Sequence, residues 1–288
     1  MPRAVDHLVI AAYDLPEQEA FYRRLGFQVG ARNRHPWGTE NHIVQFDGAF
    51  LELIGLGDEF AAPHPREAVY PFAGFLAHYL GKREGLAMLV MRSADAEADR
   101  RSFDAAGIGG FPRFDFARKG RRSDGREVEV AFSLAFAAGP ALPETGFFVC
   151  QQHFPENFWS RAAQVHPNGA LAVAGLTLVC ERPELVRPFL GAFLDAPAQA
   201  IPGGVAFTAD GTRVECVTPE AYSAFYGAPA PGPGLAAARI AVADVAACRR
   251  LLAANGIQAR ERDGAAIVEA MGTVLAFVTN GADGGARP

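Results

Sequence analysis

The pattern of apolar and polar positions in residues 5–56 predicts a strand, a helix and three further strands, in that order. Residues 5–13 alternate and are apolar enough for a half-buried strand. The helix is expected to follow Asp14, a residue type that caps helix N-termini, and to end at Gly26. The later strands are expected at 28–35, 41–46 and 49–54, with a tight turn at Asp47-Gly48 between the last two.

Two polar residues interrupt these strands. Because side chains alternate across a sheet, His7 shares a face with Val9, and Glu52 shares a face with Ile54. The neighbouring leucines point to the opposite face, which packs against the helix. A buried carboxylate needs a partner, and a metal or a hydrogen-bonded ligand can supply one. We therefore predict that His7 and Glu52 converge on the face away from the helix.

The opening pattern recurs along the chain. Strand-like segments comparable to residues 6–14 start at 87, 173 and 237, and each is followed by a helical pattern and by further strands. The sequence therefore predicts an α+β fold of four βαβββ modules, with module one paired with two and module three paired with four. The expected domains are residues 1–160 and 170–282. Residues 57–84 form either a lid over the first domain or a packed surface helix.

Composition limits the classes of function. The chain has 288 residues, of which 50% are hydrophobic, and a net charge of −5, so nothing indicates nucleic-acid binding. No apolar run reaches the ~20 residues that a membrane span needs, and no signal segment precedes the first strand. The four cysteines form no CxxC pair. These features favour a cytoplasmic, bacterial protein with reduced thiols.

Five short motifs, in this order along the chain, resemble a known superfamily. They are DHLVIAAYDL (6–15), EAFYRRLGF (19–27), HPWGTENHIVQF (35–46), AFLELIG (49–55) and QQHFPENFW with HPNGA (151–170). The chain resembles the vicinal oxygen chelate superfamily and, within it, the glyoxalase-like domain family. The resemblance covers roughly the first 180 residues. It implies that paired modules curl into cups whose inner strands carry His and Glu ligands of a divalent metal.

The resemblance implies His7 and Glu52 as two metal ligands. Gap-free alignment places Met88 and Cys150 where module two would supply two more. Gln152 is therefore the expected third ligand, with His153 or His42 as the alternatives. The ligand types suit zinc, iron, manganese or nickel.

Further site residues are expected around this pair. Glu52 and His153 are the catalytic candidates, and substrate contacts are expected from Trp37, His42 and Gln152. His42 shares its face with Val44 on a neighbouring strand. His35 and His166, which precede prolines, are expected in turns or at the rim. Lys119, Arg121 and Arg122 form a basic hairpin tip, expected to be a solvated turn, with attraction of an anionic substrate as the alternative.

The second half retains less of the pattern. Ala174 and Ala237 align with His7, and only Glu215 preserves the carboxylate of Glu52. We therefore expect the first half to hold the competent site, and the second half to be structural.

Two functions are expected from these features. The first is a metal-dependent lyase, isomerase or dioxygenase-type enzyme that acts on a small oxygenated molecule. The second is a metal-free protein of the bleomycin-resistance type that sequesters a small molecule. The sequence does not identify the substrate, and it does not decide between a monomer and a homodimer.

Overall fold

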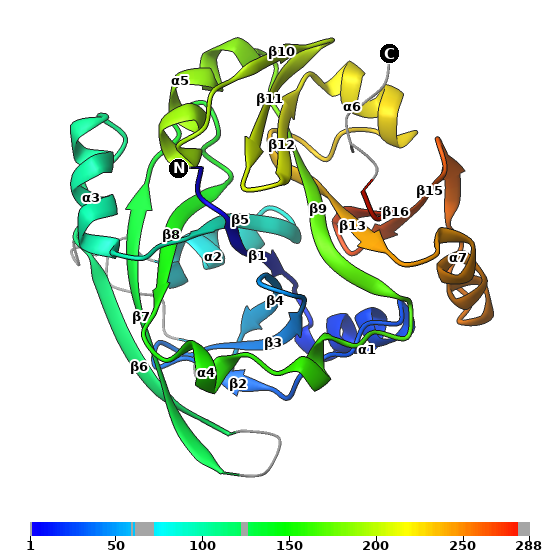
Figure 1. Cartoon of the computed structure of the whole chain (residues 1–288), viewed down its shortest axis with the longest axis horizontal. Coiled ribbons are helices and arrows are strands. Elements are labelled where there is room, and N and C mark those ends of the chain that lie inside the picture. The colour runs from blue at the N-terminus through cyan, green and yellow to red at the C-terminus, as the bar shows by residue number, and fades with distance from the viewer. Residues whose placement is uncertain (1, 59, 61–71, 122–125, 282–288) are drawn as a thin grey trace.

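Two curved sheets of eight strands each form the framework of the protein (Figure 1). The structure is a computed structural model, and it describes residues 2–58, 60, 72–121 and 126–281. The first sheet is built from the first half of the chain and the second sheet from the second half.

Each half of the chain contains two βαβββ modules. The first half comprises β1 (Val5–Ala11), α1 (Leu15–Arg24), β2 (Asn33–Arg34), β3 (Thr39–Gln45), β4 (Phe50–Leu56), α2 (Phe72–Leu80), β5 (Gly85–Arg92), α3 (Ala96–Ala105), β6 (Phe114–Arg121), β7 (Glu127–Ala137) and β8 (Gly146–Gln152). A linker with α4 (Pro155–Phe158) and the short 3-10 helix η1 (Arg161–Gln164) follows. The second half comprises β9 (Ala170–Val179), α5 (Pro183–Leu194), β10 (Gln199–Ile201), β11 (Gly204–Ala209), β12 (Thr212–Val217), α6 (Pro219–Tyr226), β13 (Gly234–Val242), α7 (Val245–Ala254), β14 (Arg260–Arg262), β15 (Ala265–Ala270) and β16 (Thr273–Thr279).

The two sheets have the same topology. The first runs β2-β3-β4-β1-β5-β8-β7-β6, and the second runs β10-β11-β12-β9-β13-β16-β15-β14. In each sheet the opening strands of two modules pair antiparallel at the centre, as β1 with β5 and as β9 with β13. The predicted α+β fold of four modules, paired one with two and three with four, is confirmed.

The module helices begin where the sequence places their caps. The Asp14 side chain accepts a hydrogen bond from the amide of Glu17 at 2.8 Å, and Asp95 and Asp244 cap α3 and α7 in the same way. At the end of the first helical segment Gly26 has φ +84°, a conformation that favours glycine. A β-carbon there would also lie 2.7 Å from Leu251 of α7.

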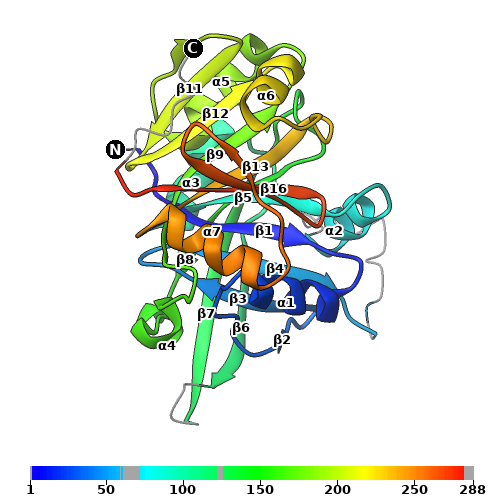
Figure 2. The ribbon, with the colours of Figure 1, turned by 90° about the vertical axis from the view of Figure 1, so that its right-hand side faces the viewer.

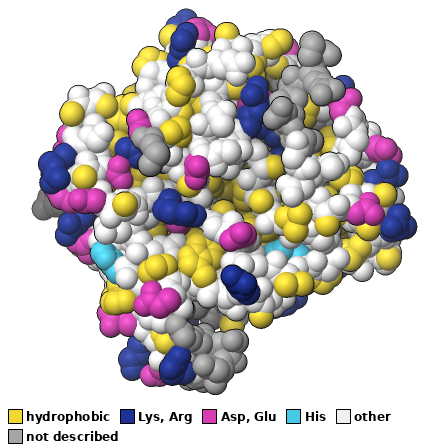
Figure 3. All heavy atoms as spheres, in the orientation of Figure 1, with side chains coloured by type: hydrophobic (Ala, Val, Ile, Leu, Met, Phe, Trp, Pro, Cys, Tyr) yellow, Lys and Arg dark blue, Asp and Glu magenta, His cyan; other side chains and the backbone are white. Residues whose placement is uncertain are grey.

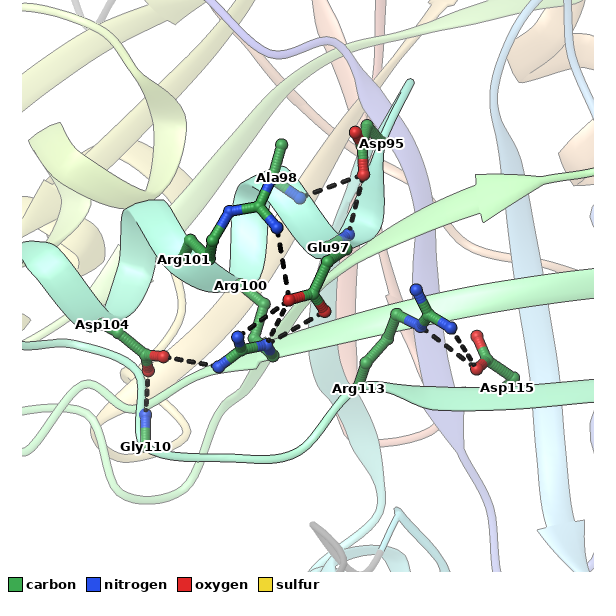
Figure 4. A network of polar contacts seen from close by, with 9 residues as sticks. All are labelled: Asp95, Glu97, Ala98, Arg100, Arg101, Asp104, Gly110, Arg113 and Asp115. Atoms are coloured by element: carbon green, nitrogen blue, oxygen red, sulfur yellow. Dashed lines mark hydrogen bonds and ion pairs between the residues drawn. The ribbon is translucent and has the colours of Figure 1, made fainter.

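Helix α3 is charged on its outer side (Figure 4). Arg100 pairs with Glu97 at 2.8 Å and with Asp104 at 2.6 Å, while Asp104 also accepts a hydrogen bond from the amide of Gly110. These groups lie at the surface, where solvent screens ion pairs, so each pair contributes little to the free energy of unfolding. The network therefore fixes the loop after α3 more than it stabilises the whole domain.

One contiguous hydrophobic core joins the two halves. Its buried residues come from both sheets, for example Leu8 and Leu176. Helix α7 of the second half lies beside α1 of the first (Figure 2). Ring contacts cross between the halves, with Phe147 and Phe193 centred 5.2 Å apart and Phe27 and Phe277 centred 5.9 Å apart. The concave face of each sheet carries its own smaller apolar cluster. These two concave faces are called the first cup and the second cup below.

The N-terminal segment is bonded to the second half. The amide of Arg3 donates to the carbonyl of Leu194 at 3.0 Å. The Arg3 guanidinium donates to the carbonyls of Ala192 and Phe193 at the end of α5, and it also pairs with Asp99 at 2.8 Å. Arg3 thereby links β1, α3 and α5.

One segment differs from the sequence-based expectation. The strand expected at 28–35 is reduced to Asn33–Arg34, because Gly30 and its neighbours contact β3 outside a regular ladder.

The segment 57–84 contains a packed helix, one of its two expected forms. Helix α2 packs on the concave side of the first sheet, and the Tyr79 hydroxyl donates to the carbonyl of Leu86 at 2.9 Å. Residues 61–71 of that segment lie outside the described residues.

The surface carries charges of both signs. Acidic and basic side chains are interspersed across the face shown in Figure 3. None of the helices in the described part of the chain has the length and apolar character required to cross a membrane.

Candidate functional site in the first cup

Strands β1 and β4 bring His7 and Glu52 to the concave face of the first sheet. The strands are parallel neighbours in which Val9 lies opposite Glu52 and His7 lies opposite Phe50. The side chains converge as the alternation predicts, with His7 Nε2 3.8 Å from Glu52 Oε2. Both residues are about 5% exposed.

A second histidine flanks the same carboxylate. His35 Nε2 lies 3.7 Å from Glu52 Oε1, and Asn41 Nδ2 donates a hydrogen bond to the same oxygen. Glu52 therefore lies between two imidazoles and an amide. Neither histidine is close enough for a direct hydrogen bond, so there is room for a bridging donor between each imidazole and the carboxylate.

The orientation of His7 is fixed by Asp6. Asp6 Oδ1 lies 2.6 Å from His7 Nδ1, and Asp6 is fully buried. A carboxylate only accepts hydrogen bonds, so Nδ1 donates and Nε2 faces Glu52. The imidazole also stacks on Phe50, with the ring centroids 4.3 Å apart.

His35 is held as a neutral base. Burial lowers the pKa of His35 to about 4, and Arg118 and His7 lower it as well, although nearby Glu52 opposes the shift. The ring stacks on Trp37 at 4.8 Å, and its Nδ1 lies 2.9 Å from the Thr39 hydroxyl. His35, expected in a turn or at the rim, is thus part of the cavity wall.

The cavity around Glu52 is small and mainly aromatic. Its volume is about 50 Å³. Because one water needs ~10–15 Å³, the cavity holds a few water molecules. It is lined by His7, His35, Trp37, Asn41, Ile43, Phe50, Glu52, Phe72, Phe116, Arg118, Phe132, Leu134, Phe148, Cys150 and Phe158.

The structure separates the other predicted site residues from this cavity, with the exception of Trp37. His42 lies on the helix side of the sheet, where Nδ1 contacts the carbonyl of Gly30 at 2.8 Å and Nε2 lies 3.3 Å from Glu19. The expectation that His42 shares the inner face is therefore corrected. His153 is exposed, and its Nε2 lies 2.8 Å from the Ser133 hydroxyl.

Gln152 contacts the site only indirectly. Its Nε2 donates to Asp6 Oδ2 at 3.0 Å, on the side of Asp6 away from the cavity, and it lines an open cleft of about 540 Å³ at the end of the sheet. Gln152 therefore supports Asp6, which in turn orients His7, and it does not reach Glu52.

The predicted metal ligands do not form a complete set. Ligands bonded at about 2.0–2.2 Å to one ion lie roughly 3–4 Å from one another, depending on the bond angle. The separations of Glu52 from His7 and His35, 3.8 and 3.7 Å, fall in this range, but the predicted third ligand, Gln152, is directed to Asp6. Within the described residues, no three His, Cys, Asp or Glu side chains are close enough to hold a metal ion.

Cys150 and Lys119 are two further candidates that the structure places outside the chemistry of the site. Burial raises the pKa of the Cys150 thiol well above its usual value, so the thiol stays protonated and unreactive in the wall of the first cup. Lys119 is exposed and lies 3.5 Å from Glu127, consistent with a solvated turn. Arg122 lies outside the described residues.

The second cup contains a buried ion pair at the position of the first cup's cavity. Glu215 lies opposite Thr177 in the ladder, as Glu52 lies opposite Val9. Glu215 Oε2 is 2.7 Å from Nη1 of Arg239, a fully buried residue. The register also shows that Gly175, and not Ala174, corresponds to His7.

The sequence reasoning did not identify His35 as a cavity residue and did not select Asn41 or Arg118. Asn41 could have been found, because a two-residue turn at Asp47-Gly48 sets the hairpin register and places Ile43 opposite Glu52. No comparable local signal marks His35, which reaches the cavity from the segment between β2 and β3.

Solved structures share this fold over nearly the whole chain. A hypothetical protein from Staphylococcus aureus matches with a TM-score of 0.67 and 10% identity, covering 96% of this chain and 99% of that one. A mutant 4-hydroxymandelate synthase from Streptomyces coelicolor matches with a TM-score of 0.60 and 14% identity, covering 96% and 91%. A fusion of a xylose isomerase-like TIM barrel with a 4-hydroxyphenylpyruvate dioxygenase matches with a TM-score of 0.57 and 12% identity, covering 96% and 48%.

The paired modules and the two cups define a protein with a glyoxalase-like fold. The family model of the glyoxalase-like domain matches residues 5–194, two thirds of the chain. The chain belongs to the glyoxalase-like domain family. No protein of curated function matches it at a significant level.

Proposed function

We propose that the protein is an enzyme that moves a proton on a small oxygenated molecule in the first cup, in a lyase or isomerase reaction in the cytoplasm. One observation carries the proposal. The carboxylate of Glu52 is buried among aromatic side chains, with an imidazole on either side and no arginine paired to it in the described part of the chain. Such a group is suited to general base catalysis.

The proposed step uses this chain's own residues. A substrate carbon beside a carbonyl group gives its proton to Glu52, and the hydrogen bond from Asn41 keeps the receiving carboxylate in place. Glu52 then returns that proton to another atom of the same intermediate, either a second carbon or the carbonyl oxygen, which completes the isomerisation. The Nε2 atoms of neutral His35 and of the Asp6-oriented His7 carry no proton, so they accept hydrogen bonds from hydroxyl groups of the substrate. The aromatic wall keeps bulk solvent away from the carboxylate.

The proposal has no metal-dependent step, since the predicted ligands do not form a complete set for a divalent ion. The predicted zinc, iron, manganese or nickel is tested by elemental analysis of the purified protein. We expect less than one equivalent of metal. A full equivalent that is lost in the His7→Ala variant would contradict the metal-free step.

Proton exchange tests the activity directly. The protein is incubated in D₂O with pyruvate, hydroxyacetone and phenylpyruvate, and proton NMR follows the loss of the signal from the carbon beside the carbonyl. We expect faster exchange for at least one compound, and a loss of about 10²-fold or more in Glu52→Gln. Glu269→Gln, an exposed glutamate paired with Arg260, is the matched control and should exchange like the wild type.

A second candidate function is sequestration of a small molecule without catalysis. The closed, apolar character of the 50 Å³ cavity favours it. Binding without exchange for every ligand that binds, and equal affinity in wild type and Glu52→Gln, would support this function over the enzyme.

A further inference from the structure

We propose that the first cup takes a small carboxylate with a flat apolar ring, and that Arg118 and Trp37 hold its carboxylate oxygens. This inference rests on the proposed site and names its class of ligand. Both residues line the cavity that contains Glu52.

Two buried hydrogen-bond donors in this cup are unused. Arg118 Nε and Trp37 Nε1 are shielded from solvent, and neither has a hydrogen-bond partner among the described residues. Leaving a buried donor unpaired costs about 1–3 kcal/mol, and more when the group is charged. Both atoms donate only, so the missing partner must supply acceptor oxygens.

Arg118 is anchored without being neutralised. It lies on β6 on the same face as Phe116, and its Nη1 donates to Asn33 Oδ1 at 3.3 Å. Within the described residues no carboxylate forms an ion pair with it. Arg239 of the second cup, in contrast, is 2.7 Å from Glu215. Glu52 attracts the Arg118 guanidinium electrostatically but forms no ion pair with it within 4 Å. A bidentate carboxylate is therefore the best match for this guanidinium.

The aromatic side chains that line the cavity indicate that the ligand carries a flat apolar ring. Trp37 and Phe116 meet edge to face with centroids 4.9 Å apart, and Phe116 stacks on Phe132 at 5.1 Å. These flat surfaces lie beside the unused donors, so an apolar ring attached to the carboxylate would replace existing ring contacts. A ring does not fit into 50 Å³, so the aromatic side chains must move apart as it enters.

Glu52 fixes the direction of the ligand. Two carboxylates repel one another in a site of low dielectric, so the ligand carboxylate must bind at Arg118 and point away from Glu52. The unused acceptor Asn41 Oδ1 lies at the Glu52 end and favours a hydroxyl or another donor there. The carbon next to that group is then the one that faces Glu52.

Calorimetric titration tests the proposal with probes that differ in charge only. Benzoate, phenylacetate and 3-phenylpropionate sample three lengths, and their amides are the neutral counterparts. We expect at least one acid to bind ten-fold or more tightly than its amide. In Arg118→Gln this preference should disappear, in Arg118→Lys part of it should return, and in Trp37→Phe the acid should bind several-fold more weakly. Arg260→Gln, an exposed arginine, is the matched control and should bind like the wild type.

Equal binding of acids and amides by the wild type, an absence of acid binding, or full acid preference in Arg118→Gln would overturn the inference. Circular dichroism of each variant checks that it is folded. The inference and the proposed function fail separately. Acid binding that persists in Glu52→Gln while no exchange is found in the wild type would refute only the enzyme. Exchange that is indifferent to Arg118→Gln would refute only the carboxylate site.

Discussion

Glu52 of the first cup and Glu215 of the second occupy the same place in their sheets but have different surroundings. In the parallel strand pair, Glu52 lies opposite Val9 and Glu215 lies opposite Thr177. Asn41 donates a hydrogen bond to Glu52, and two histidines lie 3.7 and 3.8 Å from its carboxylate oxygens. Around Glu215 are Arg239 at 2.7 Å and Arg213 at 2.6 Å.

The difference shows how one fold can produce both a site and a structural domain. In the second cup Arg239 and Arg213 neutralise Glu215, although Arg239 Nε and the Tyr222 hydroxyl have no hydrogen-bond partner among the described residues. Gly175 leaves the space that the Arg239 side chain occupies. In the first cup His7 stands at the position of Gly175, and several polar atoms are left without partners in the described part of the chain. Polar groups that remain unpaired inside a domain are available to a ligand.

The largest expected effect is in the second cup. Arg239→Met should lower the free energy of unfolding by about 3 kcal/mol, because it leaves the buried carboxylate of Glu215 with only the more exposed Arg213 as its partner. Urea denaturation measures the loss. Arg260→Met, which removes an exposed ion pair, should cost less than about 1 kcal/mol. A loss as small as this in Arg239→Met would mean that the second cup does not depend on its ion pair.

The first cup should make stability depend on pH, whereas the second half of the chain has no histidine after residue 166. Burial lowers the pKa of His35 from 6.5 to about 4. The unfolded chain therefore binds a proton at a higher pH than the folded one. The neutral, buried state of His35 therefore contributes about 3 kcal/mol to the free energy of unfolding above pH 6.5. This contribution is lost as the pH falls through about 4. His35→Gln should flatten the urea midpoints between these pH values. An unchanged pH profile would contradict the buried neutral state.

A smaller effect is expected where the two cups differ by one side chain. In Gly175→Ala a β-carbon would lie 2.4 Å from Nε of Arg239, so we expect a loss of about 1–3 kcal/mol in thermal unfolding. Gly120→Ala is the matched strand control, since its nearest neighbours lie at 3.7 Å. Equal melting temperatures for the two variants would show that Arg239 is not confined by Gly175.

The smallest effect should come from the glutamate of the first cup. Glu52→Gln keeps an oxygen that can accept the hydrogen bond of Asn41, so the free energy of unfolding should change by about 1 kcal/mol or less. Thermal unfolding beside Arg239→Met measures the contrast. A loss of several kcal/mol in Glu52→Gln would show that Glu52 is a structural residue like Glu215.

Much of the fold could be predicted because local signals repeat. The strand openings and the caps Asp14, Asp95 and Asp244 mark the modules, and glycine ends the first helical segment at Gly26. The prediction of a strand over 28–35 was wrong for most of its length, because only Asn33–Arg34 pairs with a neighbouring strand. Alternation of apolar and polar residues does not show how far a neighbouring strand extends.

The candidate site could be predicted only for residues whose face of the sheet follows from the alternation of side chains along a strand. His7 and Glu52 follow from the inner face of their strands, and their roles in catalysis or metal binding stay predictions. His42 was placed on the wrong face because the hairpin register was not applied. Arg239 lies opposite Gly175 in the ladder. The gap-free alignment matched His7 with Ala174 and not with Gly175, so it gave no reason to expect an arginine side chain in the second cup.

The attachment of Arg3 has a consequence for the order of synthesis. Its amide and guanidinium bond to carbonyls of Ala192, Phe193 and Leu194, so the segment that precedes β1 has no complete set of partners until α5 has been synthesised. Docking of this segment thus depends on translation of the third module. A chain cut between the two sheets would lack the carbonyls to which its own beginning binds.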